Sequence, residues 1–279
     1  MINLVAEIGI NHNGSLQIAF ELIRIAKEAG FDYVKFQKRC PNDCIPENQK
    51  YVVKETIWGK MPYINYKEKI EFDLHDDYEK INEFCKMVDI KWFASVWDLK
   101  SACEICIINS NVVKIPSAKI CDVQLLEYCR EYFDNVIIST GMSYEADIQK
   151  AVAISRPDVI MHSVAVYPTP VEMTRIGYVK WLVENYRDKG LCKQVGYSGH
   201  DKDIGVTIAA ILSGAEWIEK HITLSNYMFG SDQKISLEPK EMFEFVKVVR
   251  SLEKIMKGNE PREILDEELE KLEQLRGLK

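Results

Sequence analysis

Eight short apolar runs, each followed by a stretch with helical periodicity, constrain the fold of this chain more than any other feature. Such alternation of strands with helices is typical of a parallel sheet. Eight repeats predict a (β/α)8 TIM barrel of the α/β class. An open, doubly wound sheet is the alternative, although no GxGxxG motif follows the first strand. The runs cover residues 2–8, 32–37, 91–96, 112–116, 135–139, 159–163, 194–198 and 217–221, and the helical stretches cover 16–29, 77–88, 99–108, 123–132, 144–154, 171–186, 204–212 and 239–256.

The length of 279 residues suits a single barrel domain, which commonly takes about 250 residues. We expect residues 1–258 to form this catalytic barrel and the charged residues 259–279 to form a C-terminal helix or linker. The segment 38–76 contains three prolines and no clear strand pattern, so we expect a long loop after the second strand. We further expect this loop to cover the site, with Trp58, Tyr63 and Tyr66 packed over it.

The composition is that of an ordinary globular enzyme. A net charge of −7 and a pI near 5.4 argue against general affinity for nucleic acid or for an acidic membrane surface. No apolar run is long enough to span a bilayer. The eight cysteines are scattered, and the chain starts directly with a strand-like run, which predicts free thiols in a reducing cytoplasm. One CxxC pair, Cys103 and Cys106, has no second pair and lies in a helical stretch, so we assign it no redox or zinc role.

Polar side chains stand at nearly every carboxyl end of the predicted strands, where barrel chemistry gathers. Lys35 and Lys114 lie within otherwise apolar strands, and a lysine there needs an anion or a partner charge. We expect at least one of them to bind a substrate anion, and the alternative is an internal pair with a glutamate. The residues at the strand ends are Glu7, Lys35, Gln37, Ser95, Lys114, Ser117, Ser139, His162, Ser163, Tyr167, Ser198, His200, Glu219 and His221.

Two histidines, His200 and His221, follow the last two predicted strands and form a candidate metal site. Neutral imidazole suits transition metals such as Mn, Fe, Co and Zn, and neighbouring strand ends would bring the two rings together. Ser198, Glu219 and Asp232 are close in sequence, although either histidine could instead be a polar group without a metal. Together with the lysines and serines, such a site suits condensation between a phosphorylated anion and a carbonyl compound.

Eight motifs, in order along the chain, resemble those of the sialic acid synthase (N-acetylneuraminate synthase) family. They are VAEIGINHNG (5–14), VKFQ (34–37), VKIPS (113–117), STGM (139–142), YPTP (167–170), GYSGH (196–200), EKHIT (219–223) and GSDQKISLEP (230–239). The resemblance implies a TIM-barrel transferase, homodimeric, that requires Mn²⁺ or Mg²⁺. Its reaction would condense phosphoenolpyruvate with an open-chain aldose similar to N-acetylmannosamine, giving phosphate and a sialic-acid-like 2-keto-3-deoxy sugar acid.

The same resemblance implies roles for individual residues. Glu7 is similar to the family's catalytic glutamate, which handles the water that attacks C2 of the enolpyruvyl unit. The metal ligands would be His200 and His221. Lys35 and Asp232 would join Glu7 in the catalytic set, and the substrate-binding set would be Gln37, Ser95, Lys114, Ser117, Ser139, Tyr167, Ser198 and Glu219, with Lys114, Ser139 and Ser198 on the phosphate.

The chain departs from the family pattern at four places, two of which are the third strand end, FASVWD where the family often has STPF, and GYSGH where it has GLSDH. Ala165 stands where the family usually carries an asparagine, and the sequence ends at Lys279 before the small antifreeze-like domain that usually follows the barrel. We expect that domain to be truncated, supplied by another chain or unnecessary. Two other functions therefore stay open: a different metal-dependent aldolase or lyase, and a non-catalytic partner subunit. The sequence also leaves open the aldose, its phosphorylation, the choice of metal and the oligomeric state.

Overall fold

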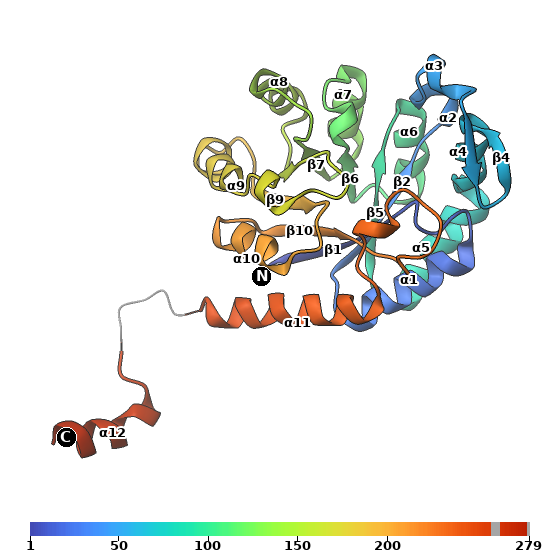
Figure 1. Ribbon diagram of the computed structural model, residues 1–279. Helices are drawn as coiled ribbons and strands as arrows, with labels where there is room; N and C mark the ends of the chain where they lie inside the picture. Colours follow the sequence, from blue (N-terminus) through green and yellow to red (C-terminus); the bar gives the residue numbers. More distant parts are fainter. Residues whose placement is uncertain (258–262, 278–279) are drawn as a thin grey trace.

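The computed structural model describes residues 1–257 and 263–277 and contains a closed barrel of eight parallel strands (Figure 1). The strand order is β1-β10-β9-β8-β7-β6-β5-β2, so the last strand closes onto the first. The predicted (β/α)8 barrel is confirmed, and the open sheet is excluded. The strands are β1 (Asn3–Gly9), β2 (Tyr33–Lys38), β5 (Lys91–Val96), β6 (Val112–Ile115), β7 (Asn135–Ser139), β8 (Val159–Ser163), β9 (Gln194–Gly199) and β10 (Trp217–His221).

Helices cover the outside of the barrel, and several begin at a side chain that accepts a hydrogen bond from a free backbone N–H of the first turn. These capping residues are Ser15, Asp98, Asp122 and Asp203. The helices are α1 (Leu16–Ala29), α5 (Glu79–Met87), α6 (Leu99–Ile108), α7 (Val123–Tyr132), α8 (Glu145–Ser155), α9 (Gly177–Leu182), α10 (Ile204–Leu212) and α11 (Pro239–Ile255), and Figure 1 shows α11 running alongside α1.

One predicted helix is divided. The stretch 171–186 contains a 3₁₀ turn at Val171–Met173, then α9, then a π-helical turn at Val183–Arg187. Arg175, between the first two, has a φ of 50°, in the left-handed region, so a continuous helix cannot pass through it. The prediction of one unbroken helix was therefore wrong, although the segment still covers the barrel between β8 and β9.

The barrel interior is apolar at the amino ends of the strands and polar at their carboxyl ends. Alternate residues of a strand point inward, so Val5 lies in the apolar layer and Glu7 in the polar layer above it. The strand register places Glu7 beside Lys35 on one side and beside His221 on the other. The fold therefore brings residues far apart in sequence to one mouth. The apolar layer consists of Val5, Phe93, Val112, Ile137, Val159, Met161 and Trp217.

The segment after β2 is not the loop that the sequence predicted. It contains two antiparallel strands and three short helices, which lie together at one side of the barrel in Figure 1. The strands escaped prediction because their residues are nearly all exposed and show no apolar alternation. Residues 57–58 form the turn between them, and Gly59, with a φ of 89°, follows this turn as the first residue of β4. We call residues 41–70 the insertion; its elements are α2 (Pro41–Cys44), α3 (Glu47–Lys50), β3 (Val53–Thr56), β4 (Gly59–Pro62) and α4 (Tyr63–Ile70), and a π-helical turn (Leu74–Tyr78) leads from it to α5.

The C-terminal part of the chain contains a further helix, α12 (Asp266–Arg276), which has no buried residue and is drawn apart from the barrel in Figure 1. The predicted boundary between residues 258 and 259 lies outside the described residues. No described helix has both the length and the apolar character needed to cross a membrane. All eight cysteines are free thiols, as expected.

Candidate functional site

A cavity of about 350 Å³ lies at the carboxyl ends of the barrel strands. Every residue that the sequence analysis placed in the catalytic, substrate-binding or metal set lines this cavity, and all eight barrel strands contribute. These residues are Glu7, Lys35, Gln37, Ser95, Lys114, Ser117, Ser139, Tyr167, Ser198, His200, Glu219, His221 and Asp232. The structure thus brings the whole predicted set together.

Four buried charges form the floor of the cavity. The Lys35 ammonium lies 2.7 Å from Oε2 of Glu7 and 3.5 Å from Oε1 of Glu219. The Lys114 ammonium lies 2.8 Å from Oε2 of Glu219. Each of the four residues is at most 3% exposed. The internal lysine–glutamate pairs that were the alternative to anion binding are therefore present, and the four charges sum to zero.

The pKa values of these groups follow from burial and from their mutual attraction. Burial alone would raise the pKa of Glu219, but the charges of Lys114 and Lys35 outweigh it and hold this pKa at about 2. Burial alone would lower the pKa of Lys35, and Glu219 and Glu7 raise it overall. Burial lowers the pKa of Lys114, so its cationic form depends on Glu219 staying ionised.

Glu7 is held in one orientation at the edge of this network. The side-chain amide of Gln37 donates to Oε1 of Glu7 at 2.9 Å, and Lys35 lies beside the other carboxylate oxygen. Lys35 also donates to the Ser95 hydroxyl at 2.8 Å, which fixes the ammonium. The carboxylate of Glu7 is therefore a preorganised base or charge at the cavity wall.

Hydroxyl groups converge on the opposite side of the barrel. The Ser117 and Ser163 hydroxyls lie 3.1 Å apart, and both accept from the Gly141 N–H, at 2.9 and 3.2 Å. Because one of these hydroxyls can donate to the other, at least one proton remains for a ligand. A Cβ at position 141 would lie 2.8 Å from the Ser117 oxygen, so this approach requires glycine. The Ser139 hydroxyl is buried without a partner, which leaves it as a further donor.

The two histidines fit a metal ion in their chemistry. Nδ1 of His200 lies 2.5 Å from the carbonyl oxygen of Val164, which can only accept, so Nδ1 carries the proton and Nε2 keeps its lone pair. Burial, with the nearby His221, lowers the pKa of His200 to about 4 and keeps the ring neutral. Nδ1 of His221 is buried without a hydrogen-bond partner, and the two ring centroids are 5.6 Å apart.

The metal-ligand set that the chain itself offers is small. The carboxylate of Asp232 lies near His221, with its Oδ2 3.9 Å from Nδ1 of the ring. Across residues 1–257 and 263–277, no group of three or more His, Cys, Asp or Glu side chains is arranged to hold a metal. The donors therefore fit a divalent ion with an open coordination sphere, in which water and substrate oxygens would supply the remaining ligands.

Tyr167 stands at the rim of the cavity. Its ring is half-exposed and its centroid lies 4.0 Å from that of His200. The peptide bond to Pro168 is cis. This stacking places the phenol next to the candidate metal site, where it limits access to the cavity.

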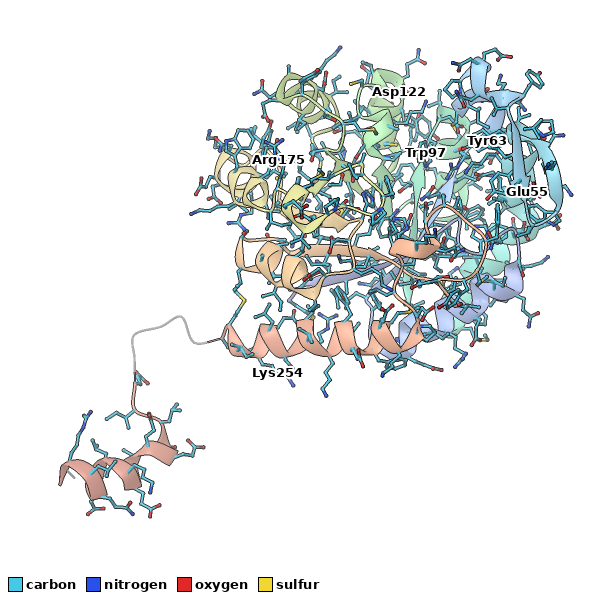
Figure 2. The ribbon with its side chains drawn as sticks, viewed as in Figure 1. Glu55, Tyr63, Trp97, Asp122, Arg175 and Lys254 are labelled. Carbon is cyan, nitrogen blue, oxygen red and sulfur yellow. The ribbon has the colours of Figure 1, made fainter. Side chains whose placement is uncertain are left out.

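Arg39, Lys67 and Trp97 are among the cavity-lining residues that sequence reasoning missed. Arg39 lies two residues after Gln37 at the end of β2, so extending the same alternation would have found it. Lys67 gave no such signal, because its segment was interpreted as a loop. The expected aromatic cover was wrong: Trp58, Tyr63 and Tyr66 do not line the cavity. Figure 2 shows Tyr63 in the insertion and Trp97 closer to the barrel.

Comparisons with known proteins agree with this geometry. The NeuB family matches residues 22–261. The N,N'-diacetyllegionaminic acid synthase of Campylobacter jejuni is 32% identical over 263 residues, which cover 91% of this chain and 77% of that protein. The N-acetylneuraminate-9-phosphate synthase of Homo sapiens is 31% identical, with 94% and 73% covered. The crystal structure of a sialic acid synthetase from Leptospira borgpetersenii, in complex with citrate, has a TM-score of 0.85 at 28% identity, with 99% and 92% covered. The resemblance seen in the motifs is confirmed, and the chain belongs to the NeuB family.

Proposed function

We propose that the chain catalyses the condensation of phosphoenolpyruvate with an open-chain aldose, giving phosphate and a nonulosonate-like 2-keto-3-deoxy sugar acid. The observation that carries the proposal is the convergence, in a NeuB-family barrel, of a fixed carboxylate, anion-binding donors and two histidines on one cavity. Family membership favours this reaction over another aldolase or lyase. The complete set of polar residues in the cavity favours catalysis over a role as an inactive partner subunit.

Phosphoenolpyruvate carries a phosphate and a carboxylate, and the donors that suit them lie on β6, β7 and β9. Lys114 donates to the Ser198 hydroxyl at 3.2 Å, and the unpartnered Ser139 hydroxyl lines the same cavity. We assign the phosphate to these three groups, with Ser117 beside them. Because the buried charges sum to zero without a ligand, this anion brings unbalanced negative charge into the site.

His200 and His221 would hold the divalent metal, Mn²⁺ or Mg²⁺, which when bound supplies positive charge and polarises the aldehyde carbonyl of the aldose. His200 contributes a neutral imidazole whose Nε2 needs no deprotonation, and His221 contributes a ring whose buried Nδ1 has no hydrogen-bond partner. The Val164 carbonyl fixes the tautomer of His200 and the direction of its ring.

Glu7 is assigned the proton transfer. After C3 of the enolpyruvyl group bonds to the aldehyde carbon, a water attacks C2, and Glu7 accepts the proton that this water loses. The former aldehyde oxygen takes up a proton and becomes a hydroxyl. The tetrahedral centre at C2 then collapses to a ketone: its new hydroxyl loses the remaining proton, the bond from C2 to the phosphate oxygen breaks, and phosphate leaves with that proton. Lys35, 2.7 Å from Glu7, keeps this carboxylate oriented.

The remaining predicted residues divide into two groups by their contacts. Tyr167, Asp232 and Gln37 face the cavity and are assigned to the aldose hydroxyls. Glu219 accepts from Lys114 and from Ser198, and Ser95 accepts from Lys35. Glu219 and Ser95 therefore act mainly by positioning the lysines.

The test of the function is phosphate release from phosphoenolpyruvate in the presence of Mn²⁺ or Mg²⁺ and a panel of aldoses. The panel contains N-acetylmannosamine, its 6-phosphate, mannose and diacetamido-dideoxyhexoses. We expect release that depends on one aldose class and on the metal. Release without any aldose, or no release in protein that binds phosphoenolpyruvate, would contradict the proposal.

The metal assignment is tested by substituting one ligand. In His221→Ala we expect loss of bound Mn²⁺ and of turnover, measured by Mn²⁺ titration and by phosphate release. His75→Ala, which removes an exposed histidine far along the chain, is the control and should retain both. Full activity in His221→Ala would exclude this metal site.

We also propose that residues 1–258 act as one catalytic domain followed by a C-terminal extension, and that the protein is a homodimer in the cytoplasm. The domain proposal is supported by the large core cluster that joins strands and helices of the barrel.

The cytoplasmic location is supported by the free cysteines, because thiols stay reduced in a reducing compartment. Sedimentation analysis would test the dimer.

A further inference from the structure

Lys67, in helix α4 of the insertion, lines the cavity although the sequence gave no reason to place it there. It is 6% exposed, and its ammonium lies 5.4 Å from the ring centroid of Tyr63 and 5.6 Å from that of Tyr66. Within the described part of the chain, no carboxylate forms an ion pair with it, and Glu71, one turn further along, pairs with Arg39 instead. Lys67 is therefore a buried cation beside two aromatic rings that has no ion-pair partner among the described residues, and only the more distant carboxylates of Glu71 and Asp232 offset its charge.

Arg39 lies next to Lys67 and is held rigidly. Its guanidinium carbon is 4.7 Å from the ring centroid of Trp97, and its Nε is 2.7 Å from Oε1 of Glu71. One terminal nitrogen donates to the side-chain oxygen of Gln37. Two cations from different elements thus converge on one wall of the cavity, where Glu71 pairs with Arg39 and neither Glu71 nor Asp232 forms an ion pair with Lys67.

This wall is separate from the group of donors assigned to phosphoenolpyruvate. Arg39 follows β2, whereas Ser139 is on β7, and four strands stand between β2 and β7 on one side of the barrel and two on the other. Gln37 links the two regions, because it contacts both Glu7 and Arg39. A ligand that reaches from the reacting carbon beside Glu7 past Gln37 would therefore end against Arg39 and Lys67.

The buried charge of Lys67 also has a physical cost. Burial, with the neighbouring Arg39, lowers the pKa of Lys67 to about 8, which shows how poorly its charge is compensated without a ligand. A bound anion would supply the missing charge and accept hydrogen bonds from both side chains.

We propose that Arg39 and Lys67 form a second anion subsite, which binds a phosphate ester at the end of the aldose far from its aldehyde. The inference rests on the proposed function and narrows it to a phosphorylated aldose. The insertion, through α4, then determines which sugar the barrel accepts.

The test compares N-acetylmannosamine with its 6-phosphate as the varied substrate, at saturating phosphoenolpyruvate, in the full-length chain. For the unmodified protein we expect kcat/KM for the 6-phosphate to exceed that for the free sugar by about tenfold or more. In Lys67→Met this ratio should fall close to one, mainly through KM for the 6-phosphate. Lys69→Met is the matched control: it removes an exposed lysine of the same helix, 5.2 Å from the Trp58 ring centroid, and should keep the ratio.

Equal use of both sugars by the unmodified protein, or an equal loss for both sugars in Lys67→Met, would overturn the subsite. Failure of the proposed function is recognised separately, as no phosphate release with any aldose. In that case calorimetry with the reduced sugar, N-acetylmannosaminitol 6-phosphate, decides the subsite, because this alditol cannot condense. Binding of this alditol phosphate that weakens about tenfold in Lys67→Met, but not in Lys69→Met, supports the subsite. No binding of the alditol phosphate to the unmodified protein, or equal binding to both variants, overturns the subsite.

Discussion

Two kinds of buried lysine line the same cavity. Lys35 and Lys114 are paired with glutamates, whereas Lys67 has only the faces of two tyrosines beside its ammonium. A paired buried charge recovers much of its lost hydration, and an unpaired one does not. Lys67 is therefore expected to destabilise the free protein, and its retention in the cavity wall fits a binding role.

Replacing this lysine should stabilise the protein. With a folded pKa of about 8 against 10.5 in the unfolded chain, charged Lys67 costs about 3 kcal/mol, and its aromatic contacts return about 1 kcal/mol. We expect Lys67→Met to raise the free energy of unfolding at pH 7 by about 2 kcal/mol. The unfolded chain binds the extra proton between pH 8 and 10.5, so the gain should be complete below pH 8 and shrink as the pH rises through that window.

Urea denaturation at pH 7 and pH 9.5 measures this effect, with Lys69→Met as the control that should change little at either pH. A Lys67→Met variant less stable than the unmodified protein at pH 7 would show that the ammonium has a structural partner.

At the level of single residues, the sequence predicted the cavity well because barrel geometry is regular. Polar side chains at the carboxyl end of a barrel strand that point inward face the mouth, so Glu7 and Glu219 could be placed without a structure, whereas His162, at the outward-facing position of β8, does not line the cavity. The ion pairs that these glutamates form were not predictable, because which lysine lies beside which glutamate depends on the stagger of the strands. Lys67 was out of reach, because its helix belongs to no barrel repeat.

Among the elements, one side chain of the barrel binds the start of the insertion at two positions. Asp98 caps α6 by accepting from the Ser101 N–H at 2.7 Å, and it also accepts from the Cys40 N–H at 2.7 Å and from the Cys44 thiol at 3.0 Å. One carboxylate thus joins the start of the insertion to the helix that follows β5. The insertion in turn positions Lys67.

Substitution of this carboxylate should cost more than loss of an ordinary helix cap. We expect Asp98→Ala to lower the free energy of unfolding by about 3 kcal/mol, since it removes a cap and leaves buried donors unpaired. Asp122→Ala, which removes the single cap bond to Leu125 at 3.2 Å on α7, is the control and should cost about 1 kcal/mol. Thermal and urea unfolding measure both. Equal losses would mean that the contacts of Asp98 with the insertion contribute nothing.

Helices and strands could be predicted from the sequence where burial of one face gives the apolar residues a regular spacing. The barrel strands and their helices show such a period, whereas β3 and β4 are exposed and do not. The stretch 171–186 has the apolar pattern of a helix but is not one continuous helix. Arg175 adopts a left-handed backbone conformation there, which the side-chain pattern does not reveal.

For the whole molecule, the barrel contains the core and the cavity, and α12 contributes no buried residue. Removal of residues 259–279 should therefore change the free energy of unfolding by less than about 0.5 kcal/mol and leave phosphate release intact. Urea denaturation and the release assay check this. A loss well above 1 kcal/mol would show that this segment packs on the barrel or on a second subunit.

Closure of the barrel was predictable from eight repeats alone, but the function needed the motifs and the relatives. The most direct test of the proposed mechanism is to run the reaction in ¹⁸O-labelled water with phosphoenolpyruvate, metal and the accepted aldose, and to measure the label in the released phosphate. Water attacks C2 in the proposed mechanism, so the released phosphate should carry no label and should appear only when the aldose is present. Labelled phosphate, or phosphate formed without aldose, would mean that water attacks phosphorus and would contradict the role assigned to Glu7.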